Sequence, residues 1–296
     1  MEPGPQDGLR KVQRQHLSFS VGKSTADSKE ERMTIPYYHV DAFTSELFGG
    51  NPAGVCIVPG FPPESIMQKI AAENRHSETA FVVSRADGDF DLRWFTPAIE
   101  DELCGHATLA SAFVLALRKH VRWPVRFHTR SGVLSVARSG DGFVMDFPAS
   151  APQPCPTPAE LLPALGLKSA TVLGGSRDYL VVLEQAEQVR GLSPDIAALE
   201  QMKIPNGGGA IVTASGENGV DYVCRLFAPS AGIPEDPATG SIHCTLAPYW
   251  GARLGKQALR AQQLSPRGGS AECTIAGNRV QITGQARLYL QGTLEL

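Results

Sequence analysis

The 296-residue chain has no apolar run of the roughly 18 residues that a membrane-spanning helix requires. Its formal net charge of −3 gives it no basic surface of the kind that binds nucleic acid or an anionic membrane. Its six cysteines are scattered without Cys-x-x-Cys spacing, so we expect neither a metal site nor a disulfide framework. We therefore expect no nucleic-acid partner and no membrane partner, and a location in the reducing cytoplasm.

The first 33 residues differ in kind from the rest. They are polar and mixed in charge, and they lack the apolar region of a signal peptide. We expect residues 1–33 to be a disordered N-terminal extension. The whole chain is 42% hydrophobic and 19% charged, as in a globular protein of enzyme size, and it is long enough for two ordinary domains.

One stretch of the sequence is written twice. Each copy has the order Arg-x-Phe-x-Pro, then Glu-Asp, then Gly followed by a polar residue and an apolar segment. These parts are Arg93–Pro97, Glu100–Asp101 and Gly105–His106 in the first copy, and Arg225–Pro229, Glu235–Asp236 and Gly240–Ser241 in the second. The phenylalanines are 132 positions apart and the glycines 135, so a three-residue insertion separates the two parts of the match. Solenoid units are far shorter, about 20–50 residues. The duplication therefore predicts two homologous halves that face each other.

Each copy of the repeat ends in a turn from a strand to a helix. Gly105 precedes a helix-compatible stretch over residues 107–119, and Gly240 precedes one that carries residues 242–250. The unpaired N–H groups of a helix N-terminus bind carboxylate or phosphate without help from lysine or arginine. Two such turns related by a pseudo-two-fold axis would hold a small anion in a shared cleft. The alternative is that both glycines merely start helices.

Strand-like stretches surround the two helices that follow the repeated glycines, and shorter helices are expected over residues 63–73 and 194–201. In the first half they cover residues 37–43, 53–58, 79–84, 91–95, 125–128, 132–137 and 143–147. In the second half they cover residues 171–175, 178–183, 209–214, 221–227, 259–263, 271–275, 280–282 and 286–290. We predict an α/β (α+β) fold of two half-barrel domains, 34–148 and 149–296, each a strand-rich sheet around a central helix. Five prolines in residues 148–158 mark the linker, and the last strand could cross to the first domain.

Several ordered sequence blocks extend from about residue 35 to the end of the chain. They are Asp41–Phe43, Gly50–Val55, Ser77–Phe81, Arg93–Pro97, Cys104–Thr108 and Glu235–Ser241. Together they resemble the phenazine-biosynthesis-like (PhzF-like) family, and within it the animal-type members. The resemblance implies the diaminopimelate-epimerase-type fold of two pseudo-symmetric half-barrels. It also implies a homodimer and cofactor-free isomerase chemistry on a small carboxylate.

The resemblance assigns catalytic roles to three residues. Glu78 stands among apolar and hydroxyl residues, which indicates partial burial, and burial favours the protonated form of a carboxyl group. It matches the family's catalytic acid/base, which takes up and returns a proton. His106 and Asp236 match the supporting pair. From the residues alone, a surface carboxylate, a helix-capping or surface histidine and a capping aspartate are the alternatives.

The resemblance also names residues for the substrate carboxylate. Gly105, Gly240 and Ser241 would supply backbone N–H groups and a hydroxyl to it, and Asn51 would be a further contact. No metal or organic cofactor is implied.

Cys104 leaves a second kind of chemistry open, because epimerases and racemases of this fold use two thiols, one on each face of the α-carbon. Cys104 lies close to the expected place of the first thiol, whereas Pro237 or Asp236 is expected at the matching place in the second half. An amino-acid or hydroxyproline epimerase with Cys104 as one base is the enzymatic alternative. The alternative from another class is a catalytically silent binding or regulatory module.

Overall fold

The computed structural model describes residues 33–119, 121–175, 177–202, 204 and 208–296. The predicted disordered extension lies outside the described residues, except for Met33. Residues Thr34–Leu296 form one compact unit. None of the helices in the described ranges is long and apolar enough to cross a membrane.

The first half of this unit alternates strands with two helices. Its elements are β1 (Thr34–Ala42), β2 (Asn51–Val58), α1 (Glu64–Asn74), β3 (Glu78–Ser84), β4 (Phe90–Phe95), β5 (Glu100–Asp101), α2 (Gly105–Leu117), β6 (Val125–Thr129), β7 (Gly132–Ser139) and β8 (Gly142–Pro148). Strands β2 and β3 run parallel with α1 as the crossover, and β4 and β6 run parallel with α2 between them. The pairs β1–β2, β3–β4, β6–β7 and β7–β8 are antiparallel.

The second half repeats this order. Its elements are β9 (Gln153–Pro154), α3 (Leu161–Ala164), β10 (Thr171–Gly174), β11 (Tyr179–Val182), α4 (Ala186–Arg190), α5 (Ile196–Gln201), β12 (Ala210–Ser215), β13 (Tyr222–Ala228), β14 (Ile233–Asp236), α6 (His243–Leu254), β15 (Ala258–Gln263), β16 (Gly269–Ala276), β17 (Arg279–Gly284) and β18 (Ala286–Glu295). Strands β11–β12 and β13–β15 are parallel, whereas β10–β11, β12–β13, β15–β16 and β16–β17 are antiparallel. Strands β10 to β17 thus correspond to β1 to β8.

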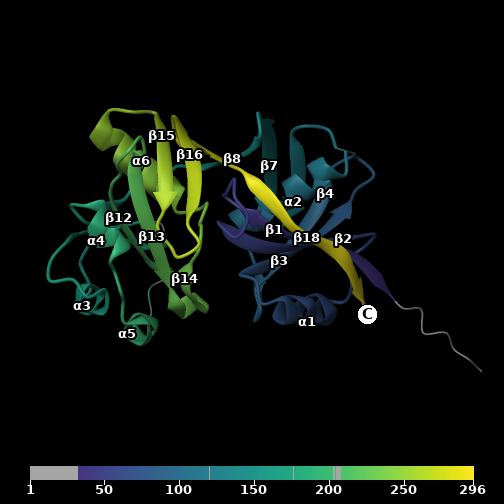
Figure 1. Ribbon diagram of the computed structural model, residues 1–296, viewed down its shortest axis with the longest axis horizontal. Coiled ribbons are helices and arrows are strands. Elements are labelled where there is room, and N and C mark those ends of the chain that lie inside the picture. The colour runs from purple at the N-terminus through teal and green to yellow at the C-terminus, as the bar shows by residue number, and fades with distance from the viewer. Residues whose placement is uncertain (1–32, 120, 176, 203, 205–207) are drawn as a thin grey trace, which may run out of the picture. The chain divides into compact units, whose positions relative to one another are not determined.

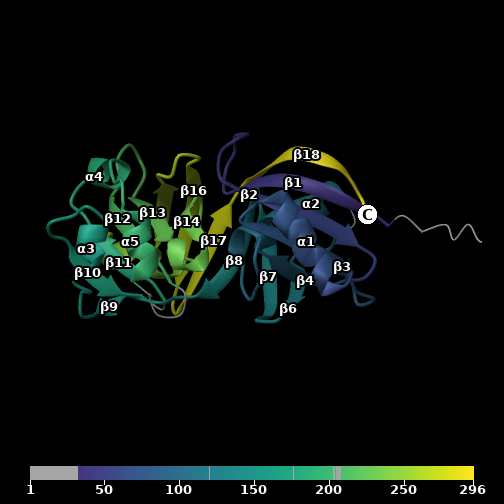
Figure 2. The ribbon, with the colours of Figure 1, turned by 90° about the horizontal axis from the view of Figure 1, so that it is seen from below.

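The two halves exchange their last strands. Strand β18 leaves the second half and pairs along β1 of the first, as the yellow strand in Figure 1 shows. Strand β9 follows the first half and pairs with β10 of the second. The equivalent strands β8 and β17 pair with each other where the halves meet (Figure 2).

Each half closes its strands around one dominant helix. Helix α2 has an apolar sequence on every face, and nine of its thirteen residues are buried. Such a helix belongs inside a protein, and α2 packs against β1, β2, β3 and β8. Helix α6 packs in the same way against β15, β16 and β17. The predicted fold class is confirmed, and most predicted strands and helices lie within a few residues of the observed ones. Strand β18, however, runs to Glu295, five residues beyond its predicted end.

Candidate active site

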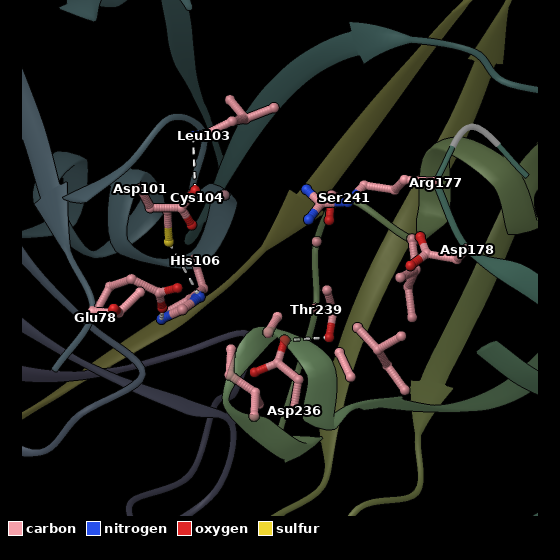
Figure 3. Close-up of a pocket in the computed structure, with 18 of the residues that line it drawn as sticks. Glu78, Asp101, Leu103, Cys104, His106, Arg177, Asp178, Asp236, Thr239 and Ser241 are labelled. Atoms are coloured by element: carbon pink, nitrogen blue, oxygen red, sulfur yellow. Dashed lines mark hydrogen bonds and ion pairs between the residues drawn. The ribbon is translucent and has the colours of Figure 1, made fainter. Parts of the chain in front are cut away.

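A cavity of about 400 Å³ lies between the two halves, a size typical of small-molecule sites. The first half contributes Glu78, Asp101 and His106 to its lining, and the second half contributes Arg177, Asp236 and Ser241 (Figure 3). The two repeated glycines meet here. A Cβ added to Gly105 would lie 3.9 Å from the Cα of Gly240, and a Cβ added to Gly240 would lie 2.9 Å from Phe43 Cζ. A side chain at position 240 would therefore clash with Phe43, whereas one at position 105 would only make an ordinary contact.

The repeated Arg and Glu residues explain how each half presents its part of the cavity. Arg93 donates from Nε and Nη2 to Glu100 at 2.7 and 2.6 Å, and Arg225 donates from the same atoms to Glu235 at 2.7 and 2.8 Å. A planar guanidinium holds a carboxylate in this two-point geometry. Each pair fixes a short strand, β5 or β14, against β4 or β13. The aspartate that follows each glutamate is thereby directed to the cavity.

Glu78 and His106 form a buried pair at the first-half end of the cavity. Glu78 is the first residue of β3, and His106 is the second residue of α2. Glu78 Oε2 lies 3.1 Å from His106 Nε2, and both residues are 5% exposed. Neither atom makes a well-directed hydrogen bond within the described part of the chain. The carboxylate and the imidazole are therefore in close contact without a well-directed hydrogen bond between them.

Asn51 holds His106 and Asp236 from behind the cavity. Its Nδ2 donates to Asp236 Oδ1 at 2.8 Å and to the Ala238 carbonyl at 3.0 Å, and its Oδ1 accepts from Ser77 Oγ at 3.2 Å. These partners fix which end of the amide is nitrogen. The same Nδ2 lies 3.2 Å from His106 Nδ1, and Cys104 Sγ lies 3.5 Å from it, so Nδ1 faces two donors and accepts in the neutral ring. His106 consequently carries its proton on Nε2, toward Glu78.

Asn51 itself does not line the cavity and is fully buried. Its predicted place as a direct substrate contact thus differs from its observed place behind His106 and Asp236. The other predicted residues, Glu78, His106, Asp236 and the Gly105, Gly240 and Ser241 set, all line the cavity.

Burial and neighbouring charges set the proton affinities of the site. Burial lowers the pKa of His106, but Glu78, Asp236 and Asp101 outweigh it, so the net shift of that pKa is upward. Burial raises the pKa of Asp236, and Glu78 adds to the rise against the opposing effect of His106. Thr239 Oγ1 donates a short hydrogen bond to the second oxygen of Asp236. The site is thus a cluster of acidic groups around one imidazole.

Comparison with known proteins decides the family. The chain matches the family described as phenazine biosynthesis-like protein, PhzC-PhzF, over residues 40–292. The chain belongs to the PhzC-PhzF family. An uncharacterized isomerase of Pseudomonas aeruginosa is 50% identical over 265 residues, which cover 89% of this chain and 100% of that protein. The phenazine biosynthesis-like domain-containing protein 2 of Mus musculus is 39% identical and covers 88% of this chain and 99% of its own length.

Solved structures agree with this assignment. A PhzF-family protein from Enterococcus faecalis, 46% identical, has a TM-score of 0.84 and covers 89% of this chain and 100% of its own. A hydroxyproline epimerase from Agrobacterium vitis has a TM-score of 0.59 over 89% of this chain and 93% of its own. At 12% identity that likeness concerns the fold alone.

The second half of this PhzC-PhzF protein has a threonine where the first has Cys104. Cys104 immediately precedes Gly105, as Thr239 immediately precedes Gly240, and both Cys104 and Thr239 line the cavity. The predicted match to Pro237 or Asp236 is therefore wrong. The three-residue insertion lies before the Glu-Asp pair, so the later positions keep a constant offset. Position 239 therefore offers a hydroxyl group, not the second thiol of a two-thiol epimerase.

Cys104 is poorly suited to form a thiolate. It is 4% exposed, and burial together with Glu78 and Asp101 raises the pKa of its thiol well above the ordinary value. Its Sγ, Glu78 and His106 offer atoms within 4.8 Å of one another, close enough to bind one metal ion. A metal bound there would take the thiolate form of Cys104 and would require release of the thiol proton.

Several residues that line the cavity of this family member were not predicted. Among them are Asp101, Arg177, Asp178 and Thr239. Asp101 could have been found, because the repeat pairs it with Asp236. Thr239 could have been found in the same way. Arg177 and Asp178 lie outside the repeated blocks, and no local pattern in the sequence marks them.

Proposed function

We propose that the protein is an isomerase that shifts a proton on a small carboxylic acid, with Glu78 as the acid/base. The observation that carries the proposal is the buried Glu78–His106 pair, whose facing atoms lie 3.1 Å apart in a cavity of about 400 Å³. Relatives named as isomerases support the reaction class. The Glu78 carboxylate takes the proton from an acidic C–H of the substrate. The electron pair moves into the substrate's conjugated carboxyl group or double bond, and the proton returns at another carbon.

The neighbouring groups support this transfer without an external acceptor. His106 Nε2 faces the Glu78 carboxylate at 3.1 Å and fixes the position of this proposed acid/base. The N–H groups at Gly105, Gly240 and Ser241 suit the oxygen atoms on which charge develops. Thr239 and Asn51 hold Asp236 in place. A homodimer in the cytoplasm stays a prediction.

The alternative with Cys104 as a base has less support. Its thiol is buried and resists deprotonation, and Thr239 occupies the equivalent position in the second half. A silent binding module would keep the cavity but would not need the Glu78–His106 pair.

Replacement of Glu78 by glutamine tests the proposal. Glu78→Gln keeps the shape and the hydrogen-bonding capacity of the side chain but removes the group that titrates. We expect substrate C–H exchange in deuterated water, followed by NMR on a panel of unsaturated carboxylic acids, to fall at least a thousandfold, about 4 kcal/mol in barrier. The melting temperature should change little.

Glu73→Gln is the matched control, because Glu73 is an exposed carboxylate on α1. It should exchange substrate at the wild-type rate. Exchange that survives in Glu78→Gln contradicts the assigned role. Ligand binding by wild type without exchange of any acid would favour the binding module.

A further inference from the structure

A buried glutamine of the second half supports the turn that carries Asp236. Gln263 is the last residue of β15, is 3% exposed and does not line the cavity. Its Nε2 donates to the carbonyl of Asp236 at 2.6 Å, and its Oε1 accepts from the N–H of Thr239 at 2.8 Å. One side chain therefore spans this turn from its first residue to its last.

The other carbonyls of the turn also accept hydrogen bonds from side chains. Ser265 Oγ donates to the Pro237 carbonyl at 2.7 Å, and Asn51 Nδ2 donates to the Ala238 carbonyl at 3.0 Å. Asn51 belongs to the first half, whereas the serine and the glutamine belong to the second. Three consecutive carbonyls thus bond to three different side chains, and the shape of the turn depends on these side chains.

The pseudo-symmetry of the fold identifies the counterpart of this glutamine. Thr129 is the last residue of β6 and pairs with Gly132, the first residue of β7. Gln263 is the last residue of β15 and pairs with Gly269, the first residue of β16. The register of the parallel pairs β4–β6 and β13–β15 gives the same correspondence. Thr129 and Gln263 therefore occupy equivalent positions.

The two halves share the serine contact but not the glutamine contact. Ser131 and Ser265 each lie two residues after these equivalent positions. They donate to the carbonyls of Glu102 and Pro237, both at 2.7 Å, and each of these residues follows the aspartate of its own half. The counterpart threonine, however, donates to a carbonyl of its own hairpin. Of the two described turns, that of the second half thus has an additional support.

The hydrogen bonds of Gln263 set the direction of the Thr239 hydroxyl. An amide nitrogen has two hydrogens. One goes to the Asp236 carbonyl, and the other points to Thr239 Oγ1 at 3.3 Å. Thr239 Oγ1 therefore accepts from the glutamine and donates its own hydrogen to the Asp236 carboxylate, the contact drawn as a dashed line in Figure 3.

The Asp236 carboxylate extends this support to the reacting pair. Burial raises the pKa of Asp236, and Thr239 opposes that rise by donating to the carboxylate. Burial lowers the pKa of His106, whereas Glu78 and Asp236 raise it. A change in the Thr239 hydrogen bond therefore alters the charge that faces the imidazole beside Glu78.

Resting on the proposed function, we propose that Gln263 is a positioning residue, which directs the Thr239 hydroxyl to Asp236 and so keeps that carboxylate in place for the proton transfer. Gln263 lies behind the cavity and acts through Thr239, without a substrate contact of its own. Its removal should leave the groups that line the cavity unchanged in kind but less well fixed in direction.

Titration of Asp236 in the full chain tests the proposal without a substrate. Carbon-13 NMR follows the carboxyl groups with pH, and Asp236→Asn identifies the signal. Thr239→Val removes the hydroxyl, so we expect the pKa of Asp236 to rise by about 0.5–1 unit. Gln263→Met removes the amide but keeps the length of the side chain, and it should shift the pKa in the same direction. In the Thr239→Val background it should add nothing further, because both changes act on one hydrogen bond.

Ser265→Ala is the matched control, since it removes a hydrogen bond from the same turn without a contact to Thr239 or to the Asp236 carboxylate. It should lower the urea midpoint and leave the pKa of Asp236 at the wild-type value. His106 and Glu78, whose charges act on Asp236, are the same in all these variants. Circular dichroism checks folding, and Gln263→Leu replaces Gln263→Met if the latter is not folded. An unchanged pKa in the glutamine variant overturns the proposal, as does an equal shift in the Thr239→Val background.

The rate of C–H exchange measures the consequence for turnover. On an unsaturated carboxylic acid that wild type exchanges, Gln263→Met should lower the rate about tenfold, and Ser265→Ala should keep it. Equal rates in Gln263→Met and wild type would contradict the positioning role. A wild type that exchanges no acid would instead contradict the proposed function and leave the titration of Asp236 as the test of Gln263, so the two failures are distinguishable.

Discussion

Asn51 shows how one buried amide can position several reacting groups. Its Nδ2 has two hydrogens but lies near three acceptors, on Asp236, Ala238 and His106, at 2.8, 3.0 and 3.2 Å. The carboxylate and the carbonyl are the nearer two and bind the hydrogens more strongly. Asn51 thus ties the second-half Asp236 to the first-half histidine, which makes it a positioning residue.

We expect Asn51→Ala to leave the Asp236 carboxylate with one buried hydrogen-bond donor fewer. Such a loss costs about 1–3 kcal/mol of stability. Misplacement of His106 should lower kcat about tenfold to a hundredfold. Burial already raises the pKa of Asp236 and Asn51 opposes that rise, so the substitution should move the acidic limb of the pH–rate profile to higher pH. Urea unfolding and pH–rate profiles measure these effects.

Asn74→Ala provides the comparison, because Asn74 Nδ2 donates to Thr79 Oγ1 at 3.2 Å outside the cavity lining. It should affect stability and leave the pH–rate profile in place. An Asn51→Ala enzyme with the wild-type profile would contradict the positioning role.

The sequence could indicate those residues whose position depends on local pattern. Gly105 and Gly240 follow from the repeat, and the repeat also contains Asp101, although its role was not recognised. The place of Asn51 behind the cavity and the position of Arg177 in its lining depend on strand register between distant segments. The register between two strands depends on which face of each strand is buried. For segments outside the repeated blocks, the sequence does not indicate this register.

The duplicated arginine–glutamate pair has different additional partners in the two halves. Arg225 is 7% exposed and also donates to the carbonyls of Val189, Arg190 and Leu192, at 3.2, 3.3 and 2.8 Å. It therefore ties β13 to the C-terminal end of α4 and to Leu192 beyond it. Glu100 of the first half, by contrast, has a second partner in Arg130, with Nη1 at 2.7 Å from Oε2.

This difference predicts unequal effects of the same substitution. Arg225→Met leaves Glu235 and three carbonyls without their partner in a buried setting, and we expect a loss of about 3–5 kcal/mol in the free energy of unfolding. Arg93→Met leaves the Glu100 carboxylate with Arg130 as a remaining partner, and we therefore expect a smaller loss of about 1–2 kcal/mol. Urea unfolding of both variants is the measurement. Equal losses would show that the two copies are energetically equivalent.

The fold as a whole joins its halves through reciprocal strand exchange. Strand β18 adds ten residues of the second half to β1, β9 adds two residues to β10, and β8 pairs with β17 between the halves. If one half unfolded alone, the other half would lose the strand that it receives from it. Apolar side chains of the folded half would then be exposed. The two domains predicted from the duplication are thus related by symmetry, but we do not expect either of them to be stable alone.

We therefore expect residues 34–296 to unfold in one cooperative transition. The three tryptophans allow each half to be followed, since Trp94 lies on β4 and Trp250 on α6. One variant keeps only Trp94 and the other keeps only Trp250, with phenylalanine at the remaining positions. Within each variant, the urea midpoint from fluorescence should coincide with that from far-ultraviolet circular dichroism, which reports both halves. A fluorescence midpoint displaced from the circular dichroism midpoint in either variant would mean that one half unfolds first, and that the exchanged strands do not couple the two.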